Sequence, residues 1–86
     1  MNVYVLVRKG VYRNEIRGIY STPEKAIKHG WEAIAKEHDD YHDFEVLKGV
    51  LDETVKYSIV WGESDLDLVV VIIKKDGNIY EDYPKD

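Results

Sequence analysis

The sequence contains no cysteine, and this absence excludes three kinds of chemistry together. Disulfide bridges, thiolate metal sites and cysteine nucleophiles all depend on that side chain. The 86 residues also lack an internal repeat, a linker and a low-complexity segment. A chain of this length builds one small hydrophobic core, so we expect a single domain over residues 1–86 that is stabilised by packing.

Long apolar runs are missing as well. The longest, residues 68–73, has the length of a strand and falls far short of a membrane span. The opening segment, MNVYVLVRKG, lacks the basic region and the extended apolar stretch of a signal peptide. We therefore expect a cytoplasmic protein without a membrane partner.

An excess of positive charge is missing too. The chain has 12 basic and 17 acidic side chains, a net charge of −5, which argues against direct binding to nucleic acid because phosphate contacts need cations. Residues 1–31 carry six basic and two acidic side chains, whereas residues 32–86 carry six and 15. This polarity suits a protein that binds a basic surface or pairs head to tail with itself, unless the fold intermixes the two halves.

Apolar patterns predict six strands. Asn2–Arg8 and Glu15–Tyr20 are rich in β-branched and aromatic residues and flank a basic loop, which indicates a hairpin. Residues 44–51 and 55–61 alternate apolar and polar side chains, and their junction is either a bulged turn or part of one long bent strand. Residues 66–74 form a nearly continuous apolar run, followed by an Asp-Gly turn signal and an edge strand over 78–83.

The segment STPEKAI, residues 21–27, predicts the start of a helix. Pro23 suits the first helical position because it has no amide hydrogen and a fixed φ. We therefore expect Thr22 as the N-cap, or Ser21 in a capping box with Glu24. The turn is explained as a structural joint, and an anion or phosphorylation site is the alternative function for it.

Helical periodicity continues from Pro23 to about His38. The apolar side recurs at three- and four-residue steps and contains Ala26, Ile27, Gly30, Trp31, Ile34 and Ala35. We expect Trp31 at the centre of this amphipathic helix. Gly30 costs about 1 kcal/mol relative to Ala within a helix, so we expect a close approach between helix and sheet there. The following HDDYHD segment is typical of a turn.

The predicted order is β-β-α-β-β-β-β. With a single helix packed on a mostly antiparallel sheet, it belongs to the α+β class. The segments that carry a family resemblance are YVL at 4–6, GIYST at 18–22, EKAI at 24–27, F-x-V at 44–46 and LD at 51–52. In these segments the chain resembles small uncharacterised proteins of phages and bacteria. The resemblance covers roughly the first two thirds of the chain and implies a hairpin, a helix, a second hairpin and a mobile-element origin.

Two histidines offer a candidate metal site. On a continuous helix, His38 and His42 would share a face, with the carboxylates of Asp39, Asp40 and Asp43 beside them, as zinc or nickel requires. The alternative is a solvated helix end, which we favour because the helix is expected to fray here. His29 lies more than two turns earlier, and no more distant His or Cys can complete the site. We therefore predict no bound metal.

Catalytic motifs are absent from the sequence. It contains no G-x-S-x-G elbow, P-loop or G-x-G-x-x-G segment. Six carboxylates are candidates for acid-base chemistry: Glu45, Asp52, Glu53, Glu63, Asp65 and Asp67. Catalysis would need a cleft that shifts their pKa values, which a helix on a sheet of this size rarely provides. We predict a noncatalytic protein without a cofactor.

An acidic surface is the leading candidate for partner binding. Its residues are Asp39, Asp40, Asp43, Glu63, Asp65 and Asp67. Carboxylates at phosphate-like spacing can occupy a basic nucleic-acid site on another protein. The resemblance to phage proteins makes inhibition of host defence a natural role for such mimicry. Ordinary solubilising charge is the alternative.

A basic aromatic loop is the second candidate. Its residues are Arg8, Lys9, Tyr12, Arg13 and Arg17. Cations beside an aromatic ring can bind a small anionic ligand or nucleotide. The sequence thus predicts an interaction protein of the cytoplasm, or of the host cytoplasm if phage-encoded, that binds a protein partner, with anion binding as the alternative. A homodimer formed through the edge strand at 78–83 is also open.

Overall fold

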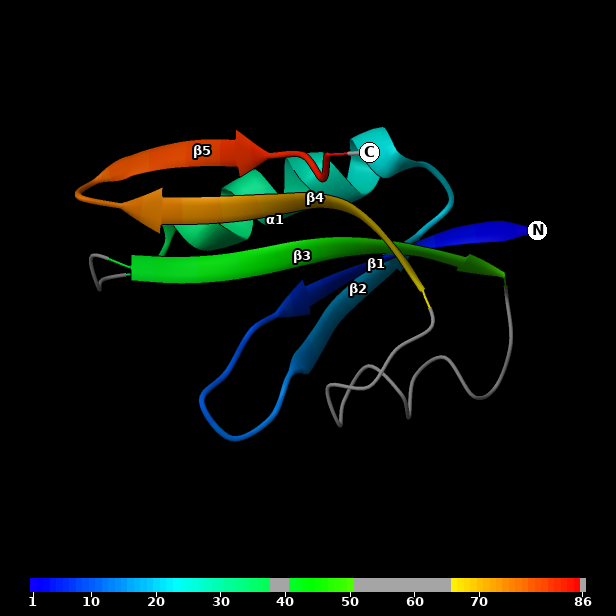
Figure 1. Ribbon diagram of the computed structural model, residues 1–86, viewed down its shortest axis with the longest axis horizontal. Coiled ribbons are helices and arrows are strands. Elements are labelled where there is room, and N and C mark those ends of the chain that lie inside the picture. Colours follow the sequence, from blue (N-terminus) through cyan, green and yellow to red (C-terminus); the bar gives the residue numbers. More distant parts are fainter. Residues whose placement is uncertain (38–40, 51–65, 86) are drawn as a thin grey trace.

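The fold is an α+β arrangement of one sheet and one helix in the described part of the chain. The computed structural model describes residues 1–37, 41–50 and 66–85. Its elements are β1 (Asn2–Arg8), β2 (Glu15–Tyr20), α1 (Pro23–Ala35), β3 (Tyr41–Val50), β4 (Asp67–Lys75) and β5 (Asn78–Asp82). The five strands are antiparallel, in the order β2-β1-β3-β4-β5, and α1 lies across one face (Figure 1). The predicted class is confirmed.

The bounds of the elements agree with the sequence pattern except around β3. β1 and β2 begin and end where expected. The helix ends at Ala35, and β3 begins at Tyr41, inside the segment predicted to be a turn. The reason is the length of β4, whose backbone pairs with β3 as far as Lys75 and outweighs the turn preference of the aspartates. The strand predicted over 55–61 lies outside the described residues.

The main core lies between the helix and the sheet. Leu6, Val46 and Val70 occupy one row across β1, β3 and β4, because each is the ladder partner of the next. They form a buried cluster with Phe44 and Ile72 of the sheet and with Ala26 and Ile34 of α1. At ~25 cal/mol per Å², burying such side chains supplies most of the favourable free energy of folding.

A second buried cluster occupies the opposite face of the sheet. It consists of Val3, Val5, Val7 and Leu47, with Ile16, Leu66 and Leu68 packed against them. Alternate residues of β1 therefore point into two different apolar clusters. β1 lies in the interior of the sheet and is covered on both faces, which explains why it is more continuously apolar than β2.

The start of α1 is built as the sequence predicts. Thr22 has an extended conformation, and its Oγ1 accepts a hydrogen bond from the backbone N–H of Lys25 at 3.3 Å. Pro23 occupies the first turn, and Glu24 lies where the helix dipole favours negative charge. Thr22, rather than Ser21, is thus the N-cap, and the STP segment is accounted for as a structural joint.

Gly30 lies on the side of α1 that packs against the sheet. A Cβ atom at this position would lie 2.5 Å from Ile72 Cδ1 and 3.1 Å from Leu6 Cδ1. The expected close approach is confirmed. Its line of contact is Ala26, Gly30 and Ile34, so Trp31 lies at the margin with 37% of its surface exposed, instead of in the core.

The β4–β5 hairpin is closed by the predicted Asp76-Gly77 turn. Lys75 and Asn78 are ladder partners, and the two residues between them have φ values of 53° and 81°. Positive φ at both central positions defines the type I′ turn, whose twist matches that of antiparallel strands. Among the described residues, α1 is neither long nor apolar enough to cross a membrane.

Candidate binding site

The structure gives the five residues predicted to form a basic anion site three different settings. Arg8 Nε donates to Glu37 Oε1 at 3.0 Å, and Lys9 Nζ lies 3.6 Å from Glu45 Oε1. Both pairs join the start of the β1–β2 loop to other elements of the fold. These two cations are therefore engaged in holding the hairpin to the rest of the protein.

The tip of the β1–β2 loop carries the next two residues of the predicted site. This loop runs from Lys9 to Asn14 and projects away from the sheet (Figure 1). Val11 and Tyr12 have 93% and 99% of their surface exposed. Arg13 is also exposed and forms no ion pair with another described residue. A projecting tip with fully exposed side chains does not surround a small molecule as a pocket does.

Arg17, the last member, is redirected by a bulge in β2. Leu6 pairs with Gly18 and Val7 with Ile16, so Arg17 is an extra residue without a ladder partner. Its guanidinium carbon lies 5.9 Å from the centre of the Phe44 ring, on the helix-covered face, while Ile16 joins the cluster on the opposite face. Bulges commonly redirect side chains in this way.

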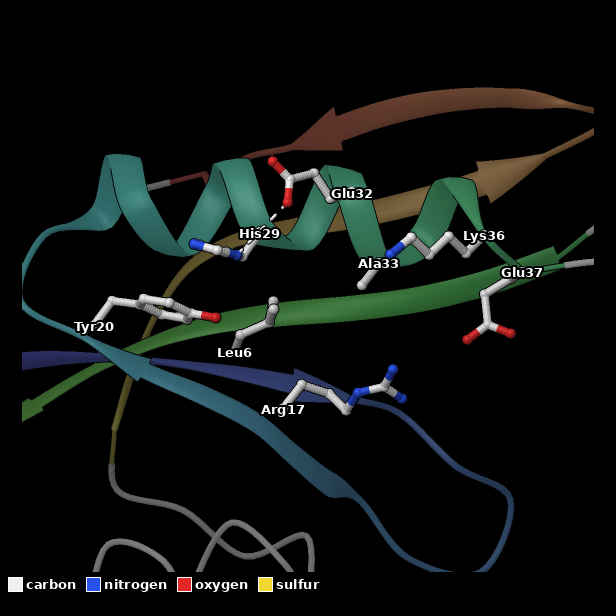
Figure 2. A pocket seen from close by; sticks show the side chains of 8 residues that line it. All are labelled: Leu6, Arg17, Tyr20, His29, Glu32, Ala33, Lys36 and Glu37. Atoms are coloured by element: carbon white, nitrogen blue, oxygen red, sulfur yellow. Dashed lines mark ion pairs between the residues drawn. The ribbon is translucent and has the colours of Figure 1, made fainter.

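Arg17 lines a hollow between α1 and β2. The hollow has a volume of about 390 Å³. Its lining residues are Leu6, Arg17, Tyr20, His29, Glu32, Ala33, Lys36 and Glu37 (Figure 2). Leu6 and Ala33 provide an apolar floor, and charged or polar side chains surround it. The volume falls within the usual range for sites that take small molecules.

An aromatic pair forms one end of the hollow. The rings of Tyr20 and His29 are stacked, with centroids 4.9 Å apart and planes 14° from parallel. Tyr20 folds back over Gly18, where an added Cβ atom would lie 2.6 Å from the Tyr20 Cζ atom. Gly18 therefore leaves the space that the ring occupies. Figure 2 shows the Tyr20 hydroxyl directed toward Leu6.

Each carboxylate of the hollow already has a partner side chain. Glu37 accepts the hydrogen bond from Arg8, and Glu32 Oε2 lies 3.7 Å from His29 Nδ1. Lys74 Nζ also donates to the backbone carbonyl of Glu37 at 2.5 Å. Lys36 forms no ion pair with another described residue, and Figure 2 shows its amine directed toward Ala33.

The predicted acidic surface falls largely outside the described residues. Asp39, Asp40, Glu63 and Asp65 all lie in the undescribed segments. Asp43 is half-buried opposite Ile73, whereas Asp67 is exposed opposite Lys48, at the other end of the β3–β4 ladder. The structure therefore does not bring Asp43 and Asp67 together. The described residues carry ten of the 17 acidic and 11 of the 12 basic side chains.

The histidine pair does not form the helical metal site considered above. His42 lies on β3, so it cannot share a helical face with His38. In the described ranges, no group of His, Asp and Glu side chains is arranged to hold a metal ion.

Sequence reasoning missed most of the hollow. His29, Glu32, Ala33 and Lys36 recur at three- and four-residue steps, which is a signal that they share a helical face. Nothing in the sequence shows that this face lies opposite Tyr20 and a bulged Arg17. Comparison with known proteins finds no matching family model, no matching curated protein and no matching solved structure. The binding interpretation therefore depends on the residues of this chain.

Proposed function

We propose that this protein is a noncatalytic binding protein whose β1–β2 loop docks on another protein. The observation that carries the proposal is the exposure of Val11 and Tyr12 at the projecting tip. Tyrosine and arginine are enriched among residues that dominate protein interfaces, and Arg13 follows Tyr12 directly. Burial of an apolar side chain by a partner contributes about 1.5–3 kcal/mol.

The other hairpin of the same sheet strengthens this interpretation. β4 and β5 are joined by two residues alone, Asp76 and Gly77, so the connection between these strands exposes no apolar side chain. The six residues of the β1–β2 loop are therefore more than the sheet requires. Arg13 follows the exposed pair and forms no ion pair with another described residue, so an acidic partner surface with an apolar pocket would be complementary in shape and charge.

The experiment is a pull-down of the tagged protein from a bacterial lysate at low and moderate salt, followed by mass spectrometry. Tyr12→Ser tests the tip, and Tyr80→Ser is the matched control because Tyr80 is an exposed tyrosine of the other hairpin. We expect a stoichiometric partner that the control retains and that Tyr12→Ser loses at least about tenfold. Circular dichroism of each variant checks the fold.

A result at the predicted acidic surface would contradict docking through the tip. Charge reversal at Asp67 alters the one exposed member of that surface among the described residues. Loss of the partner with Asp67→Lys, together with full retention by Tyr12→Ser, would place binding on the acidic residues and refute docking through the tip.

A further inference from the structure

The hollow between α1 and β2 offers cations that the rest of the fold does not fully use. Arg17 Nη1 lies 3.3 Å from Glu15 Oε1, but the Glu15 side chain is 62% exposed and does not line the hollow. Exposed pairs of this kind are weak, and a guanidinium has five donors. Lys36 adds an ammonium group without an ion-pair partner among the described residues.

The acidic side chains of the hollow have partners other than these two cations. Glu37 is neutralised by Arg8, which reaches it from outside the lining. Glu32 Oε2 lies 3.7 Å from His29 Nδ1, and its side chain is partly exposed at the rim of the hollow. The lining residues carry two cations and two carboxylates, and their outside partners Arg8 and Glu15 also balance, but Lys36 has no ion-pair partner among the described residues. An anionic group can therefore bind Lys36 and the unused donors of Arg17 without breaking the Arg8–Glu37 pair.

Arg17 is held in place before any ligand arrives. The β2 bulge turns it to the helix-covered face, and the Phe44 ring beneath it provides a cation–π contact at 5.9 Å. A prepositioned donor loses less conformational entropy on binding. Figure 2 shows Arg17 extending toward the end of the hollow where Glu37 and Lys36 lie.

The apolar floor of the hollow and its aromatic end suit a ligand with an organic body. Leu6 and Ala33 present apolar surface between the cations and the Tyr20–His29 pair. The Tyr20 hydroxyl adds a polar group directed over this floor. We infer that the hollow binds a small organic anion whose carboxylate or phosphate meets Arg17 and Lys36 and whose apolar body lies over Leu6 and Ala33.

The test is a nuclear magnetic resonance titration of the full chain at constant ionic strength. The probes are benzoate, phenyl phosphate and inorganic phosphate. Benzoate and phenyl phosphate separate a carboxylate site from a phosphate site, and inorganic phosphate tests the need for an organic body. We expect saturable shifts at Ala33, His29 and Tyr20 with one of the organic probes, with a dissociation constant in the millimolar range.

The variants assign the binding to the hollow. Arg17→Gln and Lys36→Gln should each weaken binding about tenfold, because each removes a charge-assisted hydrogen bond. Lys28→Gln is the matched control, since Lys28 is an exposed lysine of α1 that does not line the hollow. Lys36 is exposed at the end of the helix, so its variant keeps the test valid if Arg17→Gln unfolds.

Three results would overturn the inference. The first is an absence of saturable shifts with every probe. The second is an equal loss of affinity in Lys28→Gln, which would indicate general electrostatic attraction. The third is binding of inorganic phosphate as tight as that of either organic probe, which would exclude a role for the apolar floor. None of these results bears on docking of a protein at the β1–β2 tip.

Discussion

The two margins of α1 differ in how they meet the sheet. On the β5 side, Trp31 Nε1 donates to Glu81 Oε2 at 2.6 Å, and Glu81 Oε1 accepts from the Tyr83 hydroxyl, so side chains bridge helix and edge strand. On the β2 side, the helix and the edge strand leave a hollow of about 390 Å³. A single amphipathic helix can thus seal one edge of a small sheet while leaving room for a ligand at the other.

Glycine contributes to both arrangements in opposite ways. Gly30 removes a side chain so that α1 and the sheet come together over Leu6 and Ile72. Gly18 removes a side chain so that the Tyr20 ring can fold over its own strand and stack on His29. The missing side chain at Gly30 allows close packing, and the missing side chain at Gly18 makes room for the ring that forms a wall of the hollow.

Added bulk at the centre of α1 should have the largest effect. Gly30→Val places new atoms against Ile72 and Leu6, and we expect a loss of about 2–3 kcal/mol in the free energy of unfolding. Ala33→Val is the control on the β2 side, where the hollow accepts the added atoms at a cost of no more than about 1 kcal/mol. Urea unfolding measures both. Equal losses would show that the β2 margin is packed as tightly as the centre.

Removal of the bridge at the β5 margin should have a smaller effect. Trp31→Phe keeps an aromatic ring but loses the donor to Glu81, and we expect a cost of about 1 kcal/mol. The variant should be made again in a Glu81→Gln background and compared by urea unfolding. If the bridge is real, the cost of Trp31→Phe should fall when the charged acceptor is gone. An unchanged cost would assign the effect to packing alone.

Gly18→Ala should change structure more than stability. The methyl group displaces the Tyr20 ring, and the stacking lost is worth about 0.5–1.5 kcal/mol. Alanine is favoured over glycine in a strand by about 0.5–1 kcal/mol, so the net change should stay below about 1 kcal/mol. The ring-current shifts of the His29 protons should diminish. Tyr20→Phe, which keeps the ring, should preserve them, and preserved shifts in Gly18→Ala would contradict the proposed role of this glycine.

The smallest effect concerns the ionisation of Tyr83. Its hydrogen bond to Glu81, followed by desolvation and the nearby negative charge, raises the pKa of Tyr83 above its usual value of 10.0. The neutral phenol is thus favoured in the folded state, so its contribution to stability is present below pH about 10 and is lost as pH rises through the folded-state pKa. Absorbance titration should show Glu81→Gln lowering this pKa. No change would mean that the two side chains do not interact in solution.

Sequence signals predicted the elements that depend on interactions between residues close together in the chain. The Thr22-Pro23 start of α1, the Asp76-Gly77 turn and the bounds of β1 and β2 follow from capping, turn chemistry and β propensity. Gly30 could be recognised as a close approach because an unfavourable residue inside a helix needs a compensating contact. The start of β3 was misjudged, since pairing with β4 outweighs local turn preference.

The candidate sites depended on contacts between residues far apart in the chain. By itself the sequence determined the α+β class, the amphipathic helix and the excess of cations in its first part. Only the tertiary structure decided that Arg8 and Lys9 are paired with carboxylates, that Tyr12 is exposed, and that Arg17 lies on the helix-covered face of the sheet. The physical reason is that a bulge changes the face on which a side chain lies, and that the ion pairs available to a charge depend on how distant segments pack.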